Sequence, residues 1–415
     1  MIPKGYKQTE IGVIPEDWDV RKIGDFTDAT AGGTPSTSHP EYWNGEILWM
    51  SSGELNNRRI YNVLGRITEL GYNNSSTHMI PENCVLIGLA GQGKTRGTVA
   101  VNYVELCTNQ SIAAIFPSKE HNSEYLYQNL WSRYEELREL SSGDGGRGGL
   151  NLTIIKNFPC AFPELQEQNR IADALSDVDS MISSLEKLIA KKKAVKQGAM
   201  QELLTGKKRL PGFVGEWEDY TIGKMGEFYS GLSGKSKKDF DCGEAHYITF
   251  LNVLSNVKID TSILAAVDVK EGEMQNAVKK GDLFFNTSSE TPEEVGMCAV
   301  LDEDLDNTYL NSFCFGFRLN DDTHNPLFLS YYLNSAIGRR IMSVLAQGAT
   351  RYNLSKNNFA ETIIKLPTKE EQTAIASILS DMDNEIEVLE QKLEKTRQIK
   401  QGMMQQLLTG KIRLV

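Results

Sequence analysis

A segment near the middle of the chain recurs at its end. The first copy, PELQEQNRIADALSDVDSMISSLEKLIAKKKAVKQGAMQELLTGKKRL, runs from Pro163 to Leu210. The second copy, PTKEEQTAIASILSDMDNEIEVLEQKLEKTRQIKQGMMQQLLTGKIRL, runs from Pro367 to Leu414. Each residue of the second copy lies 204 positions after its counterpart, without a gap. A match of this length indicates a tandem duplication, so the fold must contain two related halves.

Each copy predicts a long amphipathic helix. Apolar residues recur at alternating spacings of three and four from Ile171 to Leu203 and again from Ile375 to Leu407, which is typical of a coiled-coil seam. Polar side chains interrupt the seam at the same place in both copies, at Lys192, Lys196, Thr396 and Lys400. A helix of about 37 residues is roughly 55 Å long. We expect the two helices to pair within the chain as an antiparallel coiled coil; the alternative is two unrelated amphipathic helices on separate cores.

Two pairs of glycines also match between the copies. Gly198 and Gly402 fall inside the helices, where glycine is costly, and therefore suggest a bend or a close packing contact. Gly206 and Gly410 follow the last apolar position, which predicts that each helix ends there with a glycine just beyond its C-terminus.

The segments that precede the helices resemble each other only loosely. Both carry a Trp and an Ile-Gly near their start, and both carry an Asn-Leu shortly before the proline that opens the helix. Alternating stretches such as CVLIGLAG and CFGFRL predict strands, and helical stretches follow them. We therefore expect an α+β chain with two globular mixed α/β domains at 1–162 and 211–366, each followed by a long helix at 163–210 and 367–415, related by an internal pseudo-twofold repeat.

Composition excludes several classes of protein. The formal net charge is −11, which disfavours a protein that binds nucleic acid through its overall charge, although local basic loops remain compatible with it. Apolar runs are too short for a transmembrane helix, and the N-terminus lacks the apolar region of a signal peptide. Six cysteines form no C-x-x-C pair, and the five histidines show no metal-ligand spacing. We expect a cytoplasmic protein with reduced thiols and no metal.

One stretch matches a nucleotide-binding motif. GLAGQGKT, from Gly88 to Thr95, fits the pattern G-x-x-x-x-G-K-[ST] at every fixed position. That motif needs a helix that begins at the Lys-Thr pair, whereas the strand-like run RGTVAVNYV follows here. We interpret the stretch as a glycine-rich loop between two strands, and a nucleotide-hydrolysing switch protein stays as the alternative.

Catalytic motifs are weak or missing. A DNA methyltransferase should carry a Pro-Pro-Tyr or Pro-Pro-Phe motif, and the chain contains no Pro-Pro pair. Asp268 and Lys270 with Asp260 upstream form half of a nuclease motif, a combination that is common by chance. The residues therefore support neither a methyltransferase nor a nuclease.

The sequence resembles that of the specificity subunit of type I restriction–modification enzymes. The resemblance spans nearly the whole chain and rests on GYKQTEIGVIPEDWDV, AGGTPSTSHPEYWNGEILWMSSGEL and the paired KQGxMQxLLTGKxRL helices. It implies two target recognition domains that each read half of a bipartite double-stranded DNA site, separated by helices that set the unread gap. It further implies docking of two methyltransferase (modification) subunits and, through them, restriction/motor subunits. It also implies that the chain is not itself an enzyme. The methyl donor and ATP would belong to those partners, so no cofactor is expected on this chain.

Candidate DNA contacts lie in polar and basic loops of both domains. Such side chains present hydrogen-bonding groups to base edges and phosphates. In the first domain the candidates are Thr34, Ser36, Asn56, Arg58, Arg59, Gln92, Lys94, Arg96, Arg147 and Asn151. In the second they are Lys235, Lys237, Lys238, Asn252, Ser288, Ser289, Arg351, Tyr352, Asn353 and Lys356. For each one the alternative is an ordinary solvated loop residue.

Two broader alternatives also remain. The chain could be a coiled-coil assembly scaffold without DNA contacts, or the recognition subunit of a related methylation-only or phage-defence system. Because phosphate neutralisation supplies much of the affinity for DNA, we expect so acidic a chain to bind DNA weakly alone and to rely on its partner subunits.

Overall fold

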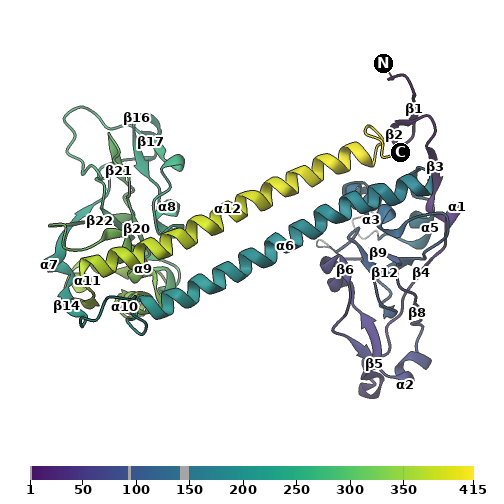
Figure 1. Ribbon diagram of the computed structural model, residues 1–415, viewed down its shortest axis with the longest axis horizontal. Coiled ribbons are helices and arrows are strands. Elements are labelled where there is room, and N and C mark those ends of the chain that lie inside the picture. Colours follow the sequence, from purple (N-terminus) through teal and green to yellow (C-terminus); the bar gives the residue numbers. More distant parts are fainter. Residues whose placement is uncertain (1, 92–94, 141–148, 349) are drawn as a thin grey trace. The chain divides into compact units, whose positions relative to one another are not determined.

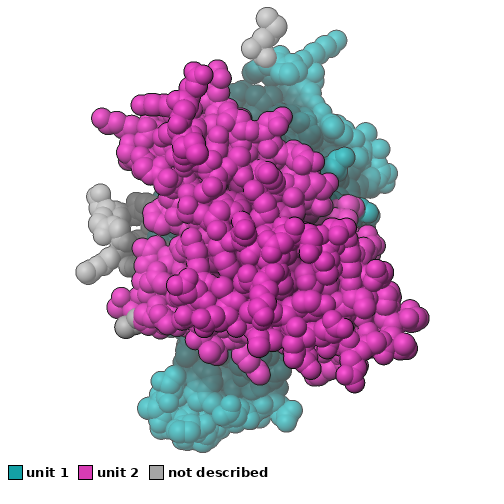
Figure 2. Space-filling view, turned by 90° about the vertical axis from the view of Figure 1, so that its left-hand side faces the viewer, with its two compact units in different colours: residues 1–186, 391–415 teal, residues 187–390 magenta. Residues whose placement is uncertain are grey.

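The computed structural model describes residues 2–91, 95–140, 149–348 and 350–415. Two compact units make up the chain: the first holds residues 1–186 and 391–415, and the second holds residues 187–390 (Figures 1 and 2). The division between the units runs through both long helices. Each unit therefore contains part of both copies of the repeated segment.

The described part of the first unit contains two larger sheets (Figure 1). The five-stranded sheet has the order β4 (Ala29–Ala31), β12 (Ile112–Ile115), β9 (Val85–Gly88), β10 (Val99–Asn102) and β6 (Arg59–Ile60). The four-stranded sheet has the order β7 (Arg66–Ile67), β5 (Trp43–Met50), β11 (Leu106–Thr108) and β8 (Met79–Ile80). Two small antiparallel pairs join β1 (Tyr6–Thr9) to β2 (Gly12–Pro15) and β3 (Asp19–Lys22) to β13 (Pro159–Phe162). The shorter helices are α1 (Ile23–Phe26), α2 (Glu69–Asn73), α3 (Ser123–Ser132), α4 (Tyr134–Glu139) and α5 (Leu152–Lys156), and the long α6 (Leu165–Leu203) begins in this unit.

The second unit repeats this plan with shorter sheets. A four-stranded sheet has the order β15 (Gly226–Ser230), β22 (Cys314–Leu319), β18 (Leu283–Asn286) and β20 (Cys298–Val300). Three-stranded sheets have the orders β17 (Ala265–Val267), β16 (Phe240–Ile248), β21 (Thr308–Leu310) and β19 (Ser288–Ser289), β24 (Tyr352–Leu354), β23 (Ala346–Gln347). One more pair joins β14 (Glu218–Thr221) to β25 (Ile363–Leu366). The shorter helices are α7 (Ile222–Met225), α8 (Phe250–Ser255), α9 (Pro326–Asn334), α10 (Ala336–Leu345) and α11 (Lys356–Ala360), and the long α12 (Lys369–Leu407) begins in this unit.

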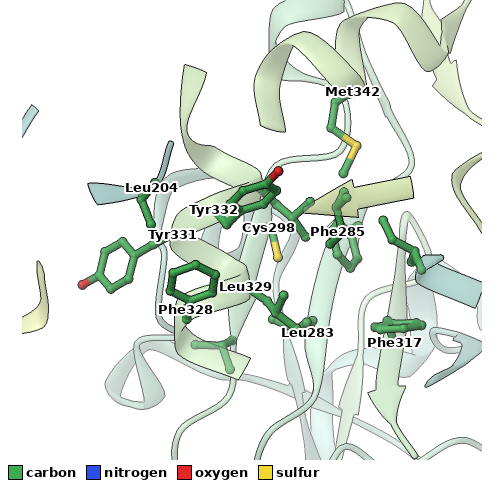
Figure 3. Packing of buried hydrophobic residues seen from close by; sticks show 14 of the residues in the cluster. Leu204, Leu283, Phe285, Cys298, Phe317, Phe328, Leu329, Tyr331, Tyr332 and Met342 are labelled. Atoms are coloured by element: carbon green, nitrogen blue, oxygen red, sulfur yellow. The ribbon is translucent and has the colours of Figure 1, made fainter. Parts of the chain in front are cut away.

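The core of the second unit includes both long helices. Figure 3 shows part of this core, to which the sheet contributes Phe285 and Phe317 and α9 contributes Phe328 and Tyr332. Leu204, just after α6, and Leu379 of α12 are buried in the same cluster. Burying a large apolar side chain contributes about 1.5–3 kcal/mol, so the helices are part of this core rather than appendages to it.

The first unit also builds a core on both helices. Trp18 and Tyr125 pack there against Ile171 and Leu175 of α6 and against Leu407 of α12. The first-unit cluster thus combines the start of α6 with the end of α12, and the second-unit cluster combines the end of α6 with the start of α12.

The long helices pair in antiparallel fashion, as the repeat predicts. In the second unit Lys192 bonds Glu385 at 2.6 Å and Lys193 bonds Glu390 at 2.7 Å. In the first unit Arg397 bonds Glu186 at 2.6 Å. Partners later in α6 lie earlier in α12, which defines the antiparallel direction.

Two of the four polar seam positions, Lys196 and Lys400, are explained by a pair of crossed ion pairs. Lys400 bonds Asp179 at 2.6 Å, and its counterpart Lys196 bonds Asp383, the counterpart of Asp179. Lys400 is only 7% exposed. Burial lowers the pKa of Lys400, and the nearby Asp179 carboxylate offsets part of that decrease. A buried lysine is retained in an apolar seam when a carboxylate pairs with it, and such pairs favour one register over others.

A second set of repeated contacts lies where each helix begins. The side chain of Gln168 accepts from the Asn122 backbone N–H at 3.0 Å, and Gln372 accepts from Asn325 at 2.9 Å. Both glutamines also donate to the carbonyl of the proline five residues earlier, at 2.9 and 2.8 Å. These contacts fix the N-termini of α3 and α9 on the long helices in the same way in both halves.

The segment after each long helix bonds the start of the other helix. Arg413, which follows α12, bonds both oxygens of Glu167 in α6 at 2.7 and 2.9 Å. Its counterpart Arg209, which follows α6, bonds both oxygens of Glu371 in α12 at 2.6 and 2.5 Å. Glu167 and Glu371 are both buried. We call these two bidentate contacts the reciprocal clamps.

The two pairs of matching glycines differ in their backbone conformation and surroundings. Gly206 and Gly410 have φ values of +69° and +68°, as expected for residues just beyond a helix C-terminus. At Gly198 and Gly402 the sequence suggests a bend or a close packing contact. The close contact is wrong, because a Cβ at either position would meet nothing within 4 Å, and the bend stays a prediction.

Alanine substitutions should distinguish a glycine that faces open space from one that is in close contact with a neighbour. We expect Gly198→Ala to raise the free energy of unfolding by up to about 1 kcal/mol, since alanine is the better helix former. Gly410→Ala should be destabilising, because its Cβ would lie 2.4 Å from Pro15 Cγ. Gly206→Ala is the matched control, with a similar φ but a nearest contact of 3.3 Å to Trp217. Urea unfolding midpoints measure all three, and equal losses for Gly206→Ala and Gly410→Ala would contradict the clash.

The clamp in the first unit should make stability depend on pH. Burial alone raises the pKa of Glu167, but hydrogen bonds from Arg413 and Trp18 outweigh it and lower the pKa overall. The hydrogen bond from Arg413 also lowers the pKa of Asp17. The stabilisation is therefore complete above the ordinary carboxyl pKa of about 4 and is lost as the pH falls through the lower folded values.

Arg413→Gln tests this dependence. Breaking a buried ion pair costs about 3–5 kcal/mol, so we expect roughly 3 kcal/mol less stability at neutral pH and a flatter acid limb of the stability curve. Arg209→Gln provides the same substitution in the second unit. Thermal unfolding followed from neutral to acidic pH measures the effect, and an unchanged acid limb in Arg413→Gln would refute it.

Candidate nucleic-acid interface

A loop tip in the second unit gathers several of the predicted DNA contacts. Strand β24 pairs with β19, so that Asn353 lies opposite Ser288 and Tyr352 lies opposite Ser289. Arg351 precedes this strand, is exposed, and donates from Nε to Ser288 Oγ at 3.2 Å. The structure thus brings five predicted residues into one place, which we call the second-unit tip: Ser288, Ser289, Arg351, Tyr352 and Asn353.

The backbone of this tip depends on a glycine. Gly348 has a φ of +137°, and a Cβ there would lie 2.1 Å from the Arg351 carbonyl oxygen. No other residue type fits without moving the chain that carries Arg351. Lys356, at the start of α11, is half-buried, with its ammonium 5.4 Å from the centre of the Phe315 ring.

The described parts of the corresponding first-unit segments, those around Leu89 and Leu150, meet in the same way, and we call these segments the first-unit tip. Leu150 N–H bonds the Leu89 carbonyl at 3.0 Å, and Leu354 N–H bonds the Thr287 carbonyl at 2.9 Å. These contacts join the same two segments in each half. Of the residues predicted in the first-unit tip, Gln92, Lys94 and Arg147 lie outside the described residues, and Arg96 is half-buried. Asn151 caps α5, since its Oδ1 accepts from Ile154 N–H at 2.9 Å.

The same region decides between the two interpretations of the motif GLAGQGKT. Strand β9 ends at Gly88, and the next regular element is β10, which pairs with β9 in antiparallel fashion. No helix begins at Thr95, so the N-terminal helix dipole that a phosphate-binding loop requires does not follow the motif. The interpretation as a loop between two strands is confirmed.

Three predicted contacts serve the fold instead. Asn252 is 1% exposed, and its amide bonds both the N–H and the carbonyl of Asp260 at 3.0 and 2.8 Å. The Lys235 side chain is 4% exposed and donates to Glu273 and to the Asp268 carbonyl. These two side chains hold loops in place and do not face solvent.

Arg59 is also committed to internal contacts. Its guanidinium bonds Glu124 at 2.6 Å and Asp179 at 3.3 Å, and it lies 4.0 Å from the centre of the Tyr127 ring. Nearby negative groups raise the pKa of Arg59 despite an opposing effect of burial, which is the largest single influence. Arg59 thus links α3 to the long helix α6.

The other predicted loop residues are scattered. Lys237 and Lys238 are exposed in a short 3₁₀ turn. Thr34 donates to Gln110, Ser36 pairs with Ser38 at 2.7 Å, and Asn56 donates to the Gly53 carbonyl at 3.0 Å. The structure does not gather these residues with either tip.

A groove in the first unit contains basic residues that the sequence did not single out. Its volume is about 1460 Å³, and β2, α3 and both long helices contribute to its walls. Arg58 lies in it with its guanidinium 4.0 Å from the centre of the Trp131 ring. The basic lining residues are Arg58, Arg59, Arg133, Arg397, Lys400 and Lys411. Four of these, Arg133, Arg397, Lys400 and Lys411, were not among the predicted DNA contacts. They lie in or beside helices or in the segment after α12, where a charged side chain alone predicts only a solvated surface.

Neither tip nor groove resembles a metal or thiol site. Among the described residues no group of three His, Cys, Asp or Glu side chains could hold a metal ion. Burial raises the pKa of the Cys84 and Cys160 thiols to about 12, which keeps them protonated at neutral pH. In the described part of the chain, no helix has both the length and the apolar content needed to cross a membrane.

Comparisons with known proteins identify relatives over the whole chain. One specificity subunit of Methanocaldococcus jannaschii is 26% identical over 413 residues, 97% of this chain and 94% of the relative. Another from the same organism is 35% identical over 187 residues, 44% of this chain and 42% of the relative. Both are named as specificity subunits of type I restriction enzymes.

Solved structures share the fold. A type I restriction–modification S subunit from M. genitalium gives a TM-score of 0.61 at 17% identity, covering 98% of this chain and 99% of that one. A chain from a structure of type I R-M complex assembly gives a TM-score of 0.57 at 15% identity, covering 96% and 99%. The model of the type I restriction modification DNA specificity domain matches twice, at residues 15–197 and 215–398. With both halves matched, the chain belongs to the family of type I restriction–modification specificity subunits, whose recognition domains it carries in two copies.

Proposed function

We propose that the two halves of this chain read the two parts of a bipartite DNA target, and that the paired helices fix the unread gap between them. The observation that carries the proposal is the repeat itself. The contacts of Gln168 and Gln372, the crossed ion pairs and the reciprocal clamps recur in both halves. The tips that these contacts support differ in sequence, as two heads that read different bases should.

The second-unit tip has suitable chemistry for reading bases. Arg351 and Asn353 are exposed and carry the side-chain types that make bidentate contacts with guanine and adenine in the major groove. Ser288 holds the Arg351 guanidinium through Nε, which leaves the terminal nitrogens for DNA. We keep 1–162 and 211–366 as the proposed recognition domains and 163–210 and 367–415 as the proposed spacer helices.

The outer surface of α6 favours a scaffold role. Met181, Leu188 and Val195 recur at intervals of seven residues and are 38–51% exposed. A row of apolar side chains on the outside of a helix pair suits the packing of another helix. We propose that two methyltransferase subunits bind the helices, that restriction/motor subunits join through them, and that this row is one of the docking surfaces.

The partners would supply what this chain lacks. They would bring the methyl donor, ATP and much of the positive charge that DNA binding by so acidic a chain requires. We place the complex in the cytoplasm, where its DNA target is. A related methylation-only or phage-defence system would use the same architecture and differ only in its partners.

Mapping methylated sites tests the proposal. DNA from cells that carry this subunit and its methyltransferase should be methylated at a motif with two specific parts and a gap of constant length. A continuous motif would contradict the bipartite reading, and the absence of any motif would favour a scaffold without DNA contacts.

Arg351→Ala should relax the reading of one half-site. A bidentate base contact is worth about 1–3 kcal/mol, so we expect roughly ten- to hundred-fold less discrimination at one or two base pairs of that half and none in the other. Binding of the assembled complex to duplexes with single substitutions in each half measures this. Arg340→Ala removes an exposed arginine of the same unit as a control. Equal weakening toward all sequences would instead mark Arg351 as a phosphate contact.

Leu188→Glu should weaken methyltransferase docking. An exposed leucine that becomes buried contributes about 1.5 kcal/mol or more, so we expect at least roughly ten-fold weaker association. Lys191→Glu changes the charge at a neighbouring exposed position without removing apolar surface. Co-purification and titration with the methyltransferase compare the two variants, and equal affinities would remove this surface from the proposal.

A further inference from the structure

The groove in the first unit has an excess of positive charge. Six basic side chains line it, against three carboxylates, those of Glu136, Asp179 and Glu186. All three carboxylates are already neutralised: Asp179 by Arg59 and Lys400, Glu136 by Arg133, and Glu186 by Arg397. Such an excess is unusual on a chain with a net charge of −11. It indicates that the groove binds a negatively charged group from outside the chain.

Two of the cations have no acidic partner. Among the described residues, neither Arg58 nor Lys411 forms an ion pair, and both are exposed. The other four cations balance the carboxylates around them. Arg58 and Lys411 are therefore the charges that the groove offers to something outside the chain.

Arg58 is held in one orientation. Its φ of +60° and ψ of −42° lie in a region that non-glycine residues rarely adopt. Its N–H bonds the Leu55 carbonyl at 3.0 Å, and its carbonyl accepts from Val101 N–H at 2.8 Å, so both neighbours impose this conformation. The guanidinium is stacked 4.0 Å from the Trp131 ring centre. Stacking fixes the plane of the group and leaves its N–H edge for an oxyanion.

The second unit lacks this arrangement. There the carbonyl that accepts from Val300 N–H, at 2.9 Å, belongs to Val257. The position in α9 that corresponds to Trp131 is Asn334, whose side chain bonds the backbone of Cys298. The groove is therefore not part of the repeated scaffold and serves the first half alone.

We propose that this groove binds the DNA phosphodiester backbone without reading sequence, with Arg58 and Lys411 as its phosphate contacts. The proposal rests on the proposed function, since it supposes that the duplex passes over the first unit. A planar guanidinium on an aromatic platform and a flexible ammonium are suited to phosphate oxygens, and neither requires a particular base. The groove would position the duplex so that the first-unit tip meets its half-site.

The test measures how DNA affinity depends on salt. The full chain, assembled with its methyltransferase, is titrated with two labelled duplexes, one carrying the mapped target and one a scrambled sequence, over a series of salt concentrations. Each phosphate contact contributes about 0.9 to the slope of log affinity against log salt. The double variant Arg58→Asn/Lys411→Gln removes both charges, and Asn accepts a positive φ more readily than most residues.

We expect the double variant to reduce the magnitude of the negative slope by about 1.8 and to weaken the binding of both duplexes by the same factor. Arg58→Lys retains the charge and should keep most of the slope. Lys119→Ala removes an exposed lysine of the same unit outside the groove and should leave both affinities unchanged.

Three results would overturn the inference. An unchanged slope in the double variant means that no phosphate lies in the groove. A loss confined to the target duplex means that Arg58 or Lys411 reads a base. Normal DNA binding with weaker methyltransferase association means that the groove holds an acidic segment of the partner. Failure of the wild-type complex to prefer its mapped target would instead refute the proposed function.

Discussion

The fold of this chain depends on the need of each long helix for the other. Neither α6 nor α12 can bury its seam alone, and the reciprocal clamps ensure that the seams meet in one direction. Arg413 reaches a nearly buried carboxylate at the start of α6, and Arg209 reaches another at the start of α12. A buried carboxylate without its guanidinium would be strongly unfavourable. The clamps are therefore satisfied only when the end of each helix lies beside the start of the other.

This arrangement explains why the compact units do not follow the chain. The first unit needs Leu407 and Arg413 from the end of the sequence to complete the core around Trp18. The second unit needs Leu203 and Arg209, which the sequence places directly before its own strands. The segment after α12 thus completes the first unit, and the segment after α6 completes the second unit in the same way. A duplicated segment can serve two domains only if each copy completes the core of both.

The repeat allowed much of this architecture to be predicted, and its limits are physical. Spacing identified the seam, its polar positions and the helix ends, because these are local properties of an amphipathic helix. It could not supply Asp179 and Asp383 as the partners of the buried lysines, since those pairs join distant residues. It also could not exclude a close contact at Gly198, because a glycine in a helix looks the same whether it makes a close contact or faces open space.

The candidate interface shows the same limit more sharply. Asn252, Lys235 and Arg59 have the side chains of DNA-reading residues, yet their hydrogen-bonding groups are used to hold turns and to join helices. Trp131 and Lys411 carry no pattern that would mark them, and they gain a shared role only because the fold places both on one groove. Residue type sets what a side chain can bind, whereas the groups already bonded to it decide whether it is free to do so. In the groove this second condition is the more selective one, because four of its six basic side chains already pair with the carboxylates of Glu136, Asp179 and Glu186. Arg58 and Lys411 stay exposed and form no ion pair with the described residues, and the proposed phosphate contact therefore depends on them.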